Sequence, residues 1–293
     1  MITEELVSNV AYTLLKNSSI RLPKDIKSAL KRAYKKETGA AGKLHIATIL
    51  QNIEIAEKTN VCVCQDTGIP LFFVKLGLKA NMKCDLKKAI VAGTERATKE
   101  TPLRENVIHP ITKKNSGTNV GWGMPHIFYD VDYDSDSIQI TAVPKGFGSE
   151  SKTVLVYIAT SEPFFLQALT KCVVDNLTAA MGDPCPPYIV GVGIGGTGEI
   201  ATMLAKKAYL RRPVDTYHPD PIVANLEKHL LKVVNKTGIG PMGMGGGVTA
   251  LAVHAEICGT HTGAVPVAVS VQCWAARQAS AKIDSDGNVK YLD

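Results

Sequence analysis

The chain has 293 residues and a formal net charge of +6, with 45% hydrophobic and 20% charged residues. This composition is ordinary for a globular protein, and the length suffices for one large core or two smaller ones. The only dense basic block, residues 24–36, indicates the solvated face of a helix rather than a nucleic-acid-binding surface. No apolar stretch is long enough to cross a bilayer, and the first residues lack a signal-peptide pattern. We therefore expect a soluble, cytoplasmic protein that binds neither nucleic acid nor membrane.

The first sixty residues have the pattern of helices. Thr3 is expected to cap the first helix, Pro23 to begin the second, and Ile46, Leu50 and Ile53 to mark the third. This region carries no catalytic signal, and we expect it to serve packing and subunit contact.

Residues 61–68, Val-Cys-Val-Cys-Gln-Asp-Thr-Gly, combine a thiol, an amide and a carboxylate in one short stretch. Residues 61–64 alternate in the manner of a β-strand, with Cys62 and Cys64 on one face. The strand would end at Asp66-Thr67-Gly68, a turn-like group, before a second apolar strand at 70–74. A strand that carries a structural cysteine is the simpler interpretation, because cysteine is often buried.

Two polar loops follow a predicted helix at 85–100. In the first, a proline ends the helix and Arg104 lies in the exit loop, where an arginine is usually a surface charge. The second loop, residues 145–149, contains glycines that could turn backbone N–H groups toward an anion. Between the loops, residues 126–133 and 137–143 indicate two strands joined as a hairpin.

The second half alternates between predicted helices and strands. We expect helices at 162–181, 199–210 and 222–234, and strands at 189–194, 249–254 and 265–271. The chain is thus predicted to be a single mixed α/β domain over residues 1–293. A helical N-terminal region, residues 1–60, precedes a β-sheet core with flanking helices.

Seven cysteines at uneven spacings do not indicate a disulfide framework in a large cytosolic chain. No Cys-x-x-Cys pair is present, so a local zinc knuckle is not expected. Cys64, Cys185 and Cys273 share one context, because each lies where a strand or helix meets a polar or proline-bound loop. The remaining cysteines are better explained by packing: Cys62, Cys84, Cys172 and Cys258.

A rival site is suggested by Gly191, Gly193 and Gly196, which satisfy G-x-G-x-x-G between a predicted strand and a predicted helix. A nucleotide-dependent oxidoreductase would need an acidic residue at the end of a second strand. Asp215 is the candidate, but no apolar strand precedes it. The glycines are better explained by close approach of the backbone.

Six motifs in order give a specific resemblance that covers nearly the whole chain. The chain resembles the α subunit of class I fumarate hydratases, and the L-tartrate dehydratase α subunit is closely similar. The motifs are Cys64-Gln65-Asp66-Thr67-Gly68, Leu103-Arg104, Lys145-Gly146-Phe147-Gly148-Ser149, Cys185-Pro186-Pro187-Tyr188, the glycine-rich loop 238–247 and Gln272-Cys273-Trp274.

The resemblance implies a hydro-lyase with a [4Fe-4S] cluster. By position, Cys64, Cys185 and Cys273 would hold three irons and leave the fourth open to substrate. The open iron would act as a Lewis acid on the substrate hydroxyl and a carboxylate oxygen.

The resemblance also implies how a dicarboxylate is bound. Arg104 would bind one carboxylate through its planar fork, with Gln65, Asp66 and the backbone at Gly146 in the same pocket. Asp66 and His261 are the expected catalytic residues. His261 would be reached across a dimer interface and take part in proton transfer.

Single-chain relatives continue into a swivelling domain that this chain lacks, so we expect a separate β subunit as a partner, and a homodimer through this chain. The first expectation is fumarate hydratase, which interconverts fumarate and (S)-malate in the tricarboxylic acid cycle. L(+)-tartrate dehydratase is the alternative, and mesaconate is a further possible substrate. A non-catalytic subunit and the nucleotide-dependent oxidoreductase are the alternatives from other classes.

Overall fold

The computed structural model describes residues 1–210 and 213–292, which form two compact units. Unit 1 comprises Met1–Pro23, Asn52–Phe147 and Arg277–Asp293, and unit 2 comprises Lys24–Gln51 and Gly148–Ala276. The predicted class, a mixed α/β fold with helices first and sheets with flanking helices after them, is confirmed. That all 293 residues act as a single domain stays a prediction.

Three helices form the N-terminal region, as predicted: α1 (Glu4–Ile20), α2 (Lys24–Lys36) and α3 (Ala40–Thr59). The expected cap is present, since the backbone N–H of Leu6 donates to Thr3 Oγ1 at 3.2 Å. α1 belongs to unit 1, whereas α2 and the first part of α3 belong to unit 2.

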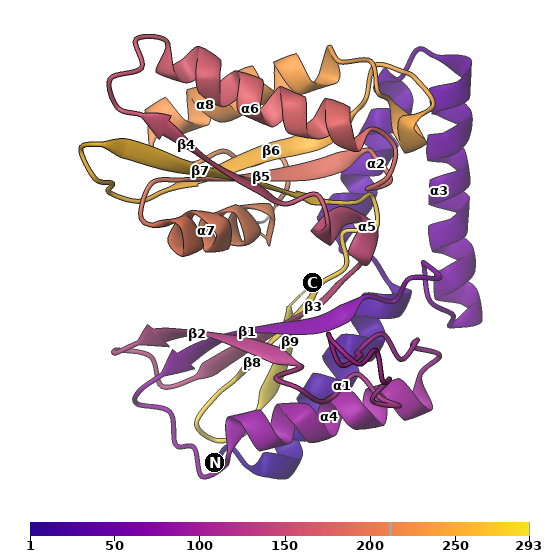
Figure 1. The fold of residues 1–293 in the computed structure, drawn as a ribbon. Coiled ribbons are helices and arrows are strands. Elements are labelled where there is room, and N and C mark those ends of the chain that lie inside the picture. The colour runs from indigo at the N-terminus through magenta and orange to yellow at the C-terminus, as the bar shows by residue number, and fades with distance from the viewer. Residues whose placement is uncertain (211–212, 293) are drawn as a thin grey trace. The chain divides into compact units, whose positions relative to one another are not determined.

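Unit 1 is a five-stranded sheet in the order β2-β1-β3-β8-β9, with α1 and α4 on one face (Figure 1). Phe72 and Ile140 of the sheet are buried against Leu14 of α1 and Ile90 of α4. The elements not yet given bounds are β1 (Ile69–Gly77), α4 (Leu86–Glu100), β2 (His126–Asp132), β3 (Ile138–Lys145), β8 (Ala279–Ile283) and β9 (Val289–Leu292).

Two sequence predictions in unit 1 are wrong. Residues 61–64 form no strand, because the Val63 backbone is bonded elsewhere: its N–H donates to Ser19 O, and its carbonyl accepts from Asn52 Nδ2. The predicted hairpin of β2 and β3 is also absent. β1 lies between them, parallel to β2 and antiparallel to β3.

Unit 2 is a four-stranded sheet in the order β4-β7-β5-β6, with α6 and α8 on one face and α7 on the other (Figure 1). Val190 of β5 and Val267 of β7 are fully buried in its core. Its elements are α5 (Phe147–Glu150, which begins in unit 1), β4 (Val154–Ala159), α6 (Phe165–Ala180), β5 (Tyr188–Ile194), α7 (Gly198–Leu210), α8 (Pro221–Asn235), η1 (Pro241–Gly243), β6 (Ala250–Ile257) and β7 (Ala264–Gln272).

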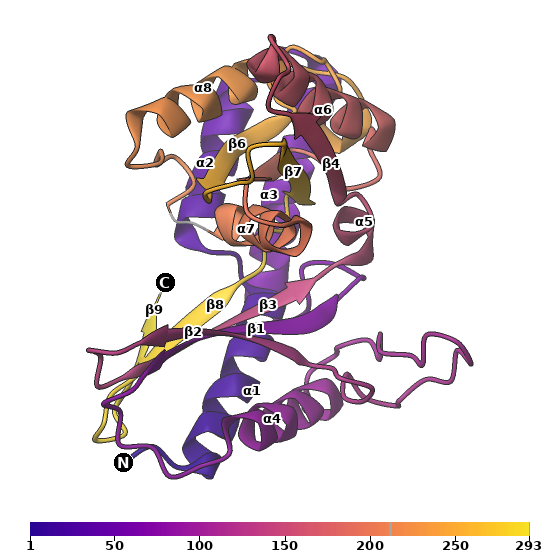
Figure 2. The ribbon, with the colours of Figure 1, turned by 60° about the vertical axis from the view of Figure 1, so that its left-hand side comes forward.

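The connection from α4 to β2 is a long loop that extends away from the sheet of unit 1 (Figure 2). Its two arms are joined by a short antiparallel bridge between Ile108 and Asn115. Across the described parts of the chain, no helix is both long enough and apolar enough to cross a membrane.

Candidate active site

Asp66 is held in unit 1 through both oxygens of its carboxylate and through its backbone carbonyl. Its Oδ1 accepts the N–H of Gly68 at 2.9 Å, and its Oδ2 accepts the N–H of Phe147 at 2.8 Å. Its backbone carbonyl accepts a hydrogen bond of 2.6 Å from Nη1 of Arg277. The carboxylate therefore anchors the turn, and each of its oxygens keeps one further lone pair for a ligand.

Gly146 lies where the Asp66 carboxylate and the Arg277 guanidinium meet. A Cβ at this position would lie 3.0 Å from Asp66 Oδ2 and 3.1 Å from Arg277 Nη2. The site therefore leaves little room for a side chain at 146. The two stretches that the resemblance assigns to substrate, Gln65-Asp66 and Gly146, are thus neighbours in this unit. Gln65 itself is exposed.

The backbone of Arg104 is fixed by hydrogen bonds, whereas its guanidinium has no partner among the described residues. Its N–H donates to Thr67 Oγ1 at 2.9 Å, and its carbonyl accepts from Asn119 Nδ2 at 2.9 Å. The exposed guanidinium makes no hydrogen bond or ion pair with residues 1–210 or 213–292. A planar fork with fixed backbone and unused donors is suited to a carboxylate.

Two asparagines that the sequence analysis did not single out hold this loop. Asn106 donates from Nδ2 to the carbonyl of Gly68 at 2.9 Å, and its backbone N–H donates to Oδ1 of Asn119 at 3.0 Å. Asn119 is buried. Both residues stand in polar loops near Arg104 in the sequence, but nothing in their spacing shows that they bond to one another.

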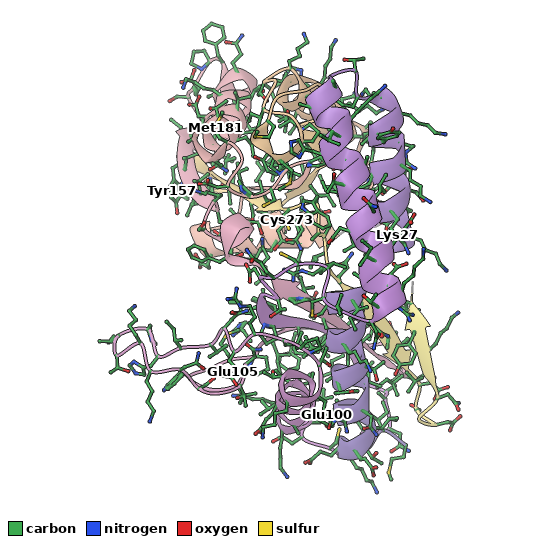
Figure 3. The ribbon with its side chains drawn as sticks, turned by 90° about the vertical axis from the view of Figure 1, so that its right-hand side faces the viewer. Lys27, Glu100, Glu105, Tyr157, Met181 and Cys273 are labelled. Carbon is green, nitrogen blue, oxygen red and sulfur yellow. The ribbon has the colours of Figure 1, made fainter. Side chains whose placement is uncertain are left out.

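Cys185 and Cys273 are brought together in unit 2. Cys185 precedes β5, and Cys273, labelled in Figure 3, follows β7. Since the two strands pair antiparallel, with Ile189 opposite Gln272, these ends meet at one edge of the sheet. The N–H of Trp274 donates to the carbonyl of Cys185 at 3.1 Å. The structure thus brings these two cysteines to the same edge of the sheet, where both are half-buried.

Cys64, the third predicted ligand, belongs to unit 1 and is also half-buried. Its neighbour Cys62 donates a thiol hydrogen bond to the carbonyl of Pro102 at 3.5 Å. Burial raises the pKa of the Cys62 thiol, and nearby Cys64 raises it further, while the charge of Arg277 opposes both. A thiol kept protonated is a poor metal ligand, which argues against Cys62 as a ligand.

The remaining cysteines are placed as packing residues or on the surface. Cys172 packs against the core of unit 2, where burial raises its pKa, and Cys258 is exposed. None of the seven cysteines is in a disulfide. Within residues 1–210 and 213–292, no group of three or more His, Cys, Asp or Glu side chains is close enough to hold a metal ion.

His261 lies on the exposed loop that joins β6 to β7, where its Nδ1 accepts the N–H of Gly263 at 3.0 Å. This loop precedes β7 and Cys273 follows it. The nine residues of that strand span roughly 30 Å. Within unit 2, His261 is therefore at the opposite edge of the sheet from Cys185 and Cys273.

The glycines of the rival site are used for packing. A Cβ at Gly191 would collide with the carbonyl of Ala205, and a Cβ at Gly193 with that of Ala201. Because Gly191 and Gly193 have no side chain, α7 can lie directly on β5. Asp215 is on no strand, and its carboxylate pairs with Arg32 at 3.0 Å. The predicted explanation, close approach of the backbone, is confirmed.

Comparison with known proteins decides the family. The family model described as fumarate hydratase (Fumerase) matches residues 8–282. The chain belongs to this family. The resemblance noted in the sequence is thereby confirmed, and it places the chain among hydro-lyases that depend on iron–sulfur clusters.

Individual proteins are also similar to this chain over nearly its whole length. The putative L(+)-tartrate dehydratase subunit alpha of Methanocaldococcus jannaschii is 44% identical over 286 residues, which cover 97% of this chain and 99% of that protein. The L(+)-tartrate dehydratase subunits alpha of Escherichia coli (strain K12) and Shigella sonnei are each 34% identical over 282 residues, covering 96% of this chain and 91% of theirs.

The chemistry of the cysteine pair in unit 2 suits the iron–sulfur cluster on which this family depends. Its two half-buried thiols stand together at one edge of the sheet. Soft thiolates are the usual ligands of iron–sulfur clusters. In unit 1, Arg277 places a buried positive charge beside Asp66, with its Nε unpaired, as suits a place where anionic groups gather.

Proposed function

We propose that this chain is the α subunit of a two-subunit L(+)-tartrate dehydratase. The observation that carries the proposal is the similarity to proteins named as that subunit over nearly the full length of both chains. Fumarate was the first expectation from the sequence. Residues 145–149, one of the motifs of the resemblance, anchor Asp66 through the N–H of Phe147, a task that either dicarboxylate would require, so this stretch does not discriminate between them.

Cys64, Cys185 and Cys273 would hold a [4Fe-4S] cluster. When bound, the cluster supplies a Lewis acid that assists departure of the hydroxyl group, which is otherwise a poor leaving group. Cys185 and Cys273 support this assignment through their shared sheet edge, and Cys64 through the bonding of its neighbour Cys62 to Pro102.

Arg104 would bind one carboxylate of the substrate. Its backbone is fixed at both the N–H and the carbonyl, so the guanidinium presents its donors with little reorganisation. Gln65, exposed beside Asp66, would donate to the substrate, and Asp66 would accept from a substrate hydroxyl through its remaining lone pairs. The two backbone N–H bonds give Asp66 an anchoring role, and the catalytic role that the resemblance implies for it stays a prediction.

His261 would transfer a proton in the active site of a second copy of this chain. The support is its place at the sheet edge opposite to Cys185 and Cys273, roughly 30 Å of strand away within the same unit. Its Nδ1 accepts a backbone N–H, which leaves Nε2 as the atom for proton exchange. A homodimer follows from this assignment.

A separate β subunit would complete the site. Relatives of this chain are named as α subunits, which implies a second subunit in those proteins. Arg104 presents one exposed guanidinium, whereas the substrate has two carboxylates to bind. The β subunit would supply the remaining cationic groups.

The substrate is tested by reconstituting the chain anaerobically with iron and sulfide, adding the β subunit, and assaying four compounds at equal concentration. Loss of water from either tartrate gives the enol of oxaloacetate, so oxaloacetate is followed for the two tartrates, and loss of the ultraviolet absorbance of the double bond is followed for fumarate and mesaconate. We expect L(+)-tartrate to give the highest kcat/KM, ahead of D(−)-tartrate, fumarate and mesaconate. Preference for fumarate would return the assignment to fumarate hydratase.

A further inference from the structure

Arg277 is a buried cation with an incomplete set of partners. Its side chain is 2% exposed, and its Nη1 donates to the carbonyl of Asp66 at 2.6 Å. Its Nε is buried without a hydrogen-bond partner, and none of the carboxylates described for the chain lies within ion-pair distance of it. A buried charge destabilises a fold unless other charges or hydrogen bonds offset it. Packing alone therefore does not explain an arginine at this position.

The contacts of Arg277 are with the residues proposed to bind substrate. Its Nη1 holds the backbone carbonyl of Asp66, directly after Gln65. Its Nη2 faces Gly146 on the side where a Cβ would stand, 3.1 Å from that point. The Asp66 carboxylate closes the group from the other side, through its hydrogen bond to the N–H of Phe147.

These contacts join three segments that are far apart in the sequence. Removing the guanidinium would leave the Asp66 carbonyl unbonded and open space beside Gly146. Both changes act on the spacing between the turn that carries Gln65 and the backbone at 146. A lysine at 277 would keep the charge but would not reproduce the planar, multidentate donor geometry.

We propose that Arg277 is a positioning residue, which holds the Gln65–Asp66 turn against Gly146 and offsets the negative charge of a dicarboxylate bound there. The substrate part of this proposal rests on the proposed function. The positioning of the Gln65–Asp66 turn does not rest on the proposed function, because it follows from hydrogen bonds and packing within the chain itself.

The positioning of the Gln65–Asp66 turn by Arg277 is tested by hydrogen–deuterium exchange on the full chain without metal or substrate. Arg277→Ala and Arg277→Lys are compared with the natural protein. We expect faster exchange in peptides covering 61–68 and 144–150 in both variants, and unchanged exchange in α6 and α8. The matched control is Arg96→Ala, which removes another arginine of unit 1 with a buried, unpaired Nε. Arg96 bonds Asn9 and stacks on Tyr12, so its loss should affect exchange in α1 and α4 instead.

The effect on substrate is tested in the reconstituted complex with the β subunit. We expect Arg277→Lys to raise KM for the dicarboxylate by about tenfold or more, with a smaller change in kcat and normal iron content. Added guanidinium ion should restore part of the lost kcat/KM to Arg277→Ala and none to Arg96→Ala. A merely structural role would give neither the split between KM and kcat nor the rescue.

Unchanged exchange at 61–68 and 144–150 in both variants would overturn the positioning role. Loss of iron with an unchanged KM would assign Arg277 to holding the metal group and would overturn the substrate part. If Arg277→Ala does not fold, Arg277→Lys decides the matter by the same two measurements. If the natural complex turns over no dicarboxylate, the proposed function fails, while the exchange result still decides whether Arg277 holds the turn.

Discussion

The backbone N–H of Trp274 donates a hydrogen bond of 3.1 Å to the carbonyl oxygen of Cys185. This single bond ties the segment that follows β7 to the segment that precedes β5. Because the thiols of Cys185 and Cys273 are carried by these two segments, the fold of unit 2 alone delivers two of the three proposed cluster ligands to one edge of its sheet.

Serine at any of the three proposed ligand positions should abolish iron binding. Cys64→Ser, Cys185→Ser and Cys273→Ser each replace a soft thiolate by a harder and far less acidic hydroxyl. Iron and sulfide per chain after anaerobic reconstitution are the measurement. Cys172→Ser and Cys62→Ser are the controls and should keep nearly normal iron. Iron that is lost in Cys62→Ser and kept in Cys64→Ser would reverse the choice between these neighbours.

Arg104→Lys should weaken turnover and leave iron content unchanged. The variant keeps the charge but loses the planar fork, and the backbone bonds to Thr67 and Asn119 do not depend on the side chain. For Arg104→Ala, kcat/KM should fall on the order of a hundredfold, since a substrate carboxylate left without its charged partner in the assembled site costs about 2–5 kcal/mol. Steady-state kinetics of the reconstituted complex measure this. A fully active Arg104→Ala enzyme would remove the residue from the site.

His261 should act on the neighbouring chain of a dimer. We expect His261→Ala and Cys273→Ser to be inactive separately and to regain activity when co-expressed, because a mixed dimer contains one site with intact cysteines and an intact histidine. Random pairing restores on the order of a quarter of the natural activity. Co-expressed Cys273→Ser and Cys185→Ser chains are the control pair. Each of these chains lacks one ligand of its own cluster, so no site in the mixed dimer is intact and no activity should return. No recovery in the first pair would place His261 in its own chain's site or outside catalysis.

Glu37 should make the stability of unit 2 depend on acid pH. Its side chain is fully buried, and burial would raise its pKa, but four backbone N–H groups outweigh burial and lower the pKa. The donors are Thr38, Gly39, Gly247 and Val248. A carboxyl with a lowered pKa in the folded state stabilises the fold above its unfolded pKa, near 4.3, and this contribution is lost as the pH falls through the folded value.

Glu37→Gln should therefore lower the free energy of unfolding by about 2 kcal/mol at pH 7, and much less below pH 4. Urea unfolding at several pH values measures this difference. Glu54→Gln, at an exposed carboxylate on α3, is the control and should change little at any pH. An equal loss at pH 7 and at low pH would show that the charge of Glu37 does not anchor the glycine-rich loop 238–247.

The sequence was sufficient where structure depends on neighbours along the chain. Thr3 was recognised as a cap, and Cys185 and Cys273 were recognised by their places at element ends. It failed at 61–64, where alternation indicated a strand. The Val63 backbone is bonded to Ser19 and Asn52 of two helices, and no local pattern reveals such distant partners.

The supporting residues of the site could not be predicted for the same reason. Asn119 and Arg277 act through hydrogen bonds to Arg104 and Asp66, and neither stands in a periodic pattern or a motif with a known mechanism. The hairpin was wrong because strand order is a tertiary property, since β1 is inserted between two strands that follow each other in the chain. The residues proposed to bear the chemistry were visible in the sequence, whereas those that hold them in place required the fold.

The proposed site is cluster-dependent, binds L(+)-tartrate and is completed by a β subunit. Oxaloacetate formation from L(+)-tartrate, measured anaerobically for the reconstituted chain with confirmed iron, with and without the β subunit, tests all three properties together. We expect no turnover by the chain alone and turnover that rises to saturation as the β subunit is added. Full turnover by the chain alone, or none with the β subunit and iron both present, would contradict this expectation.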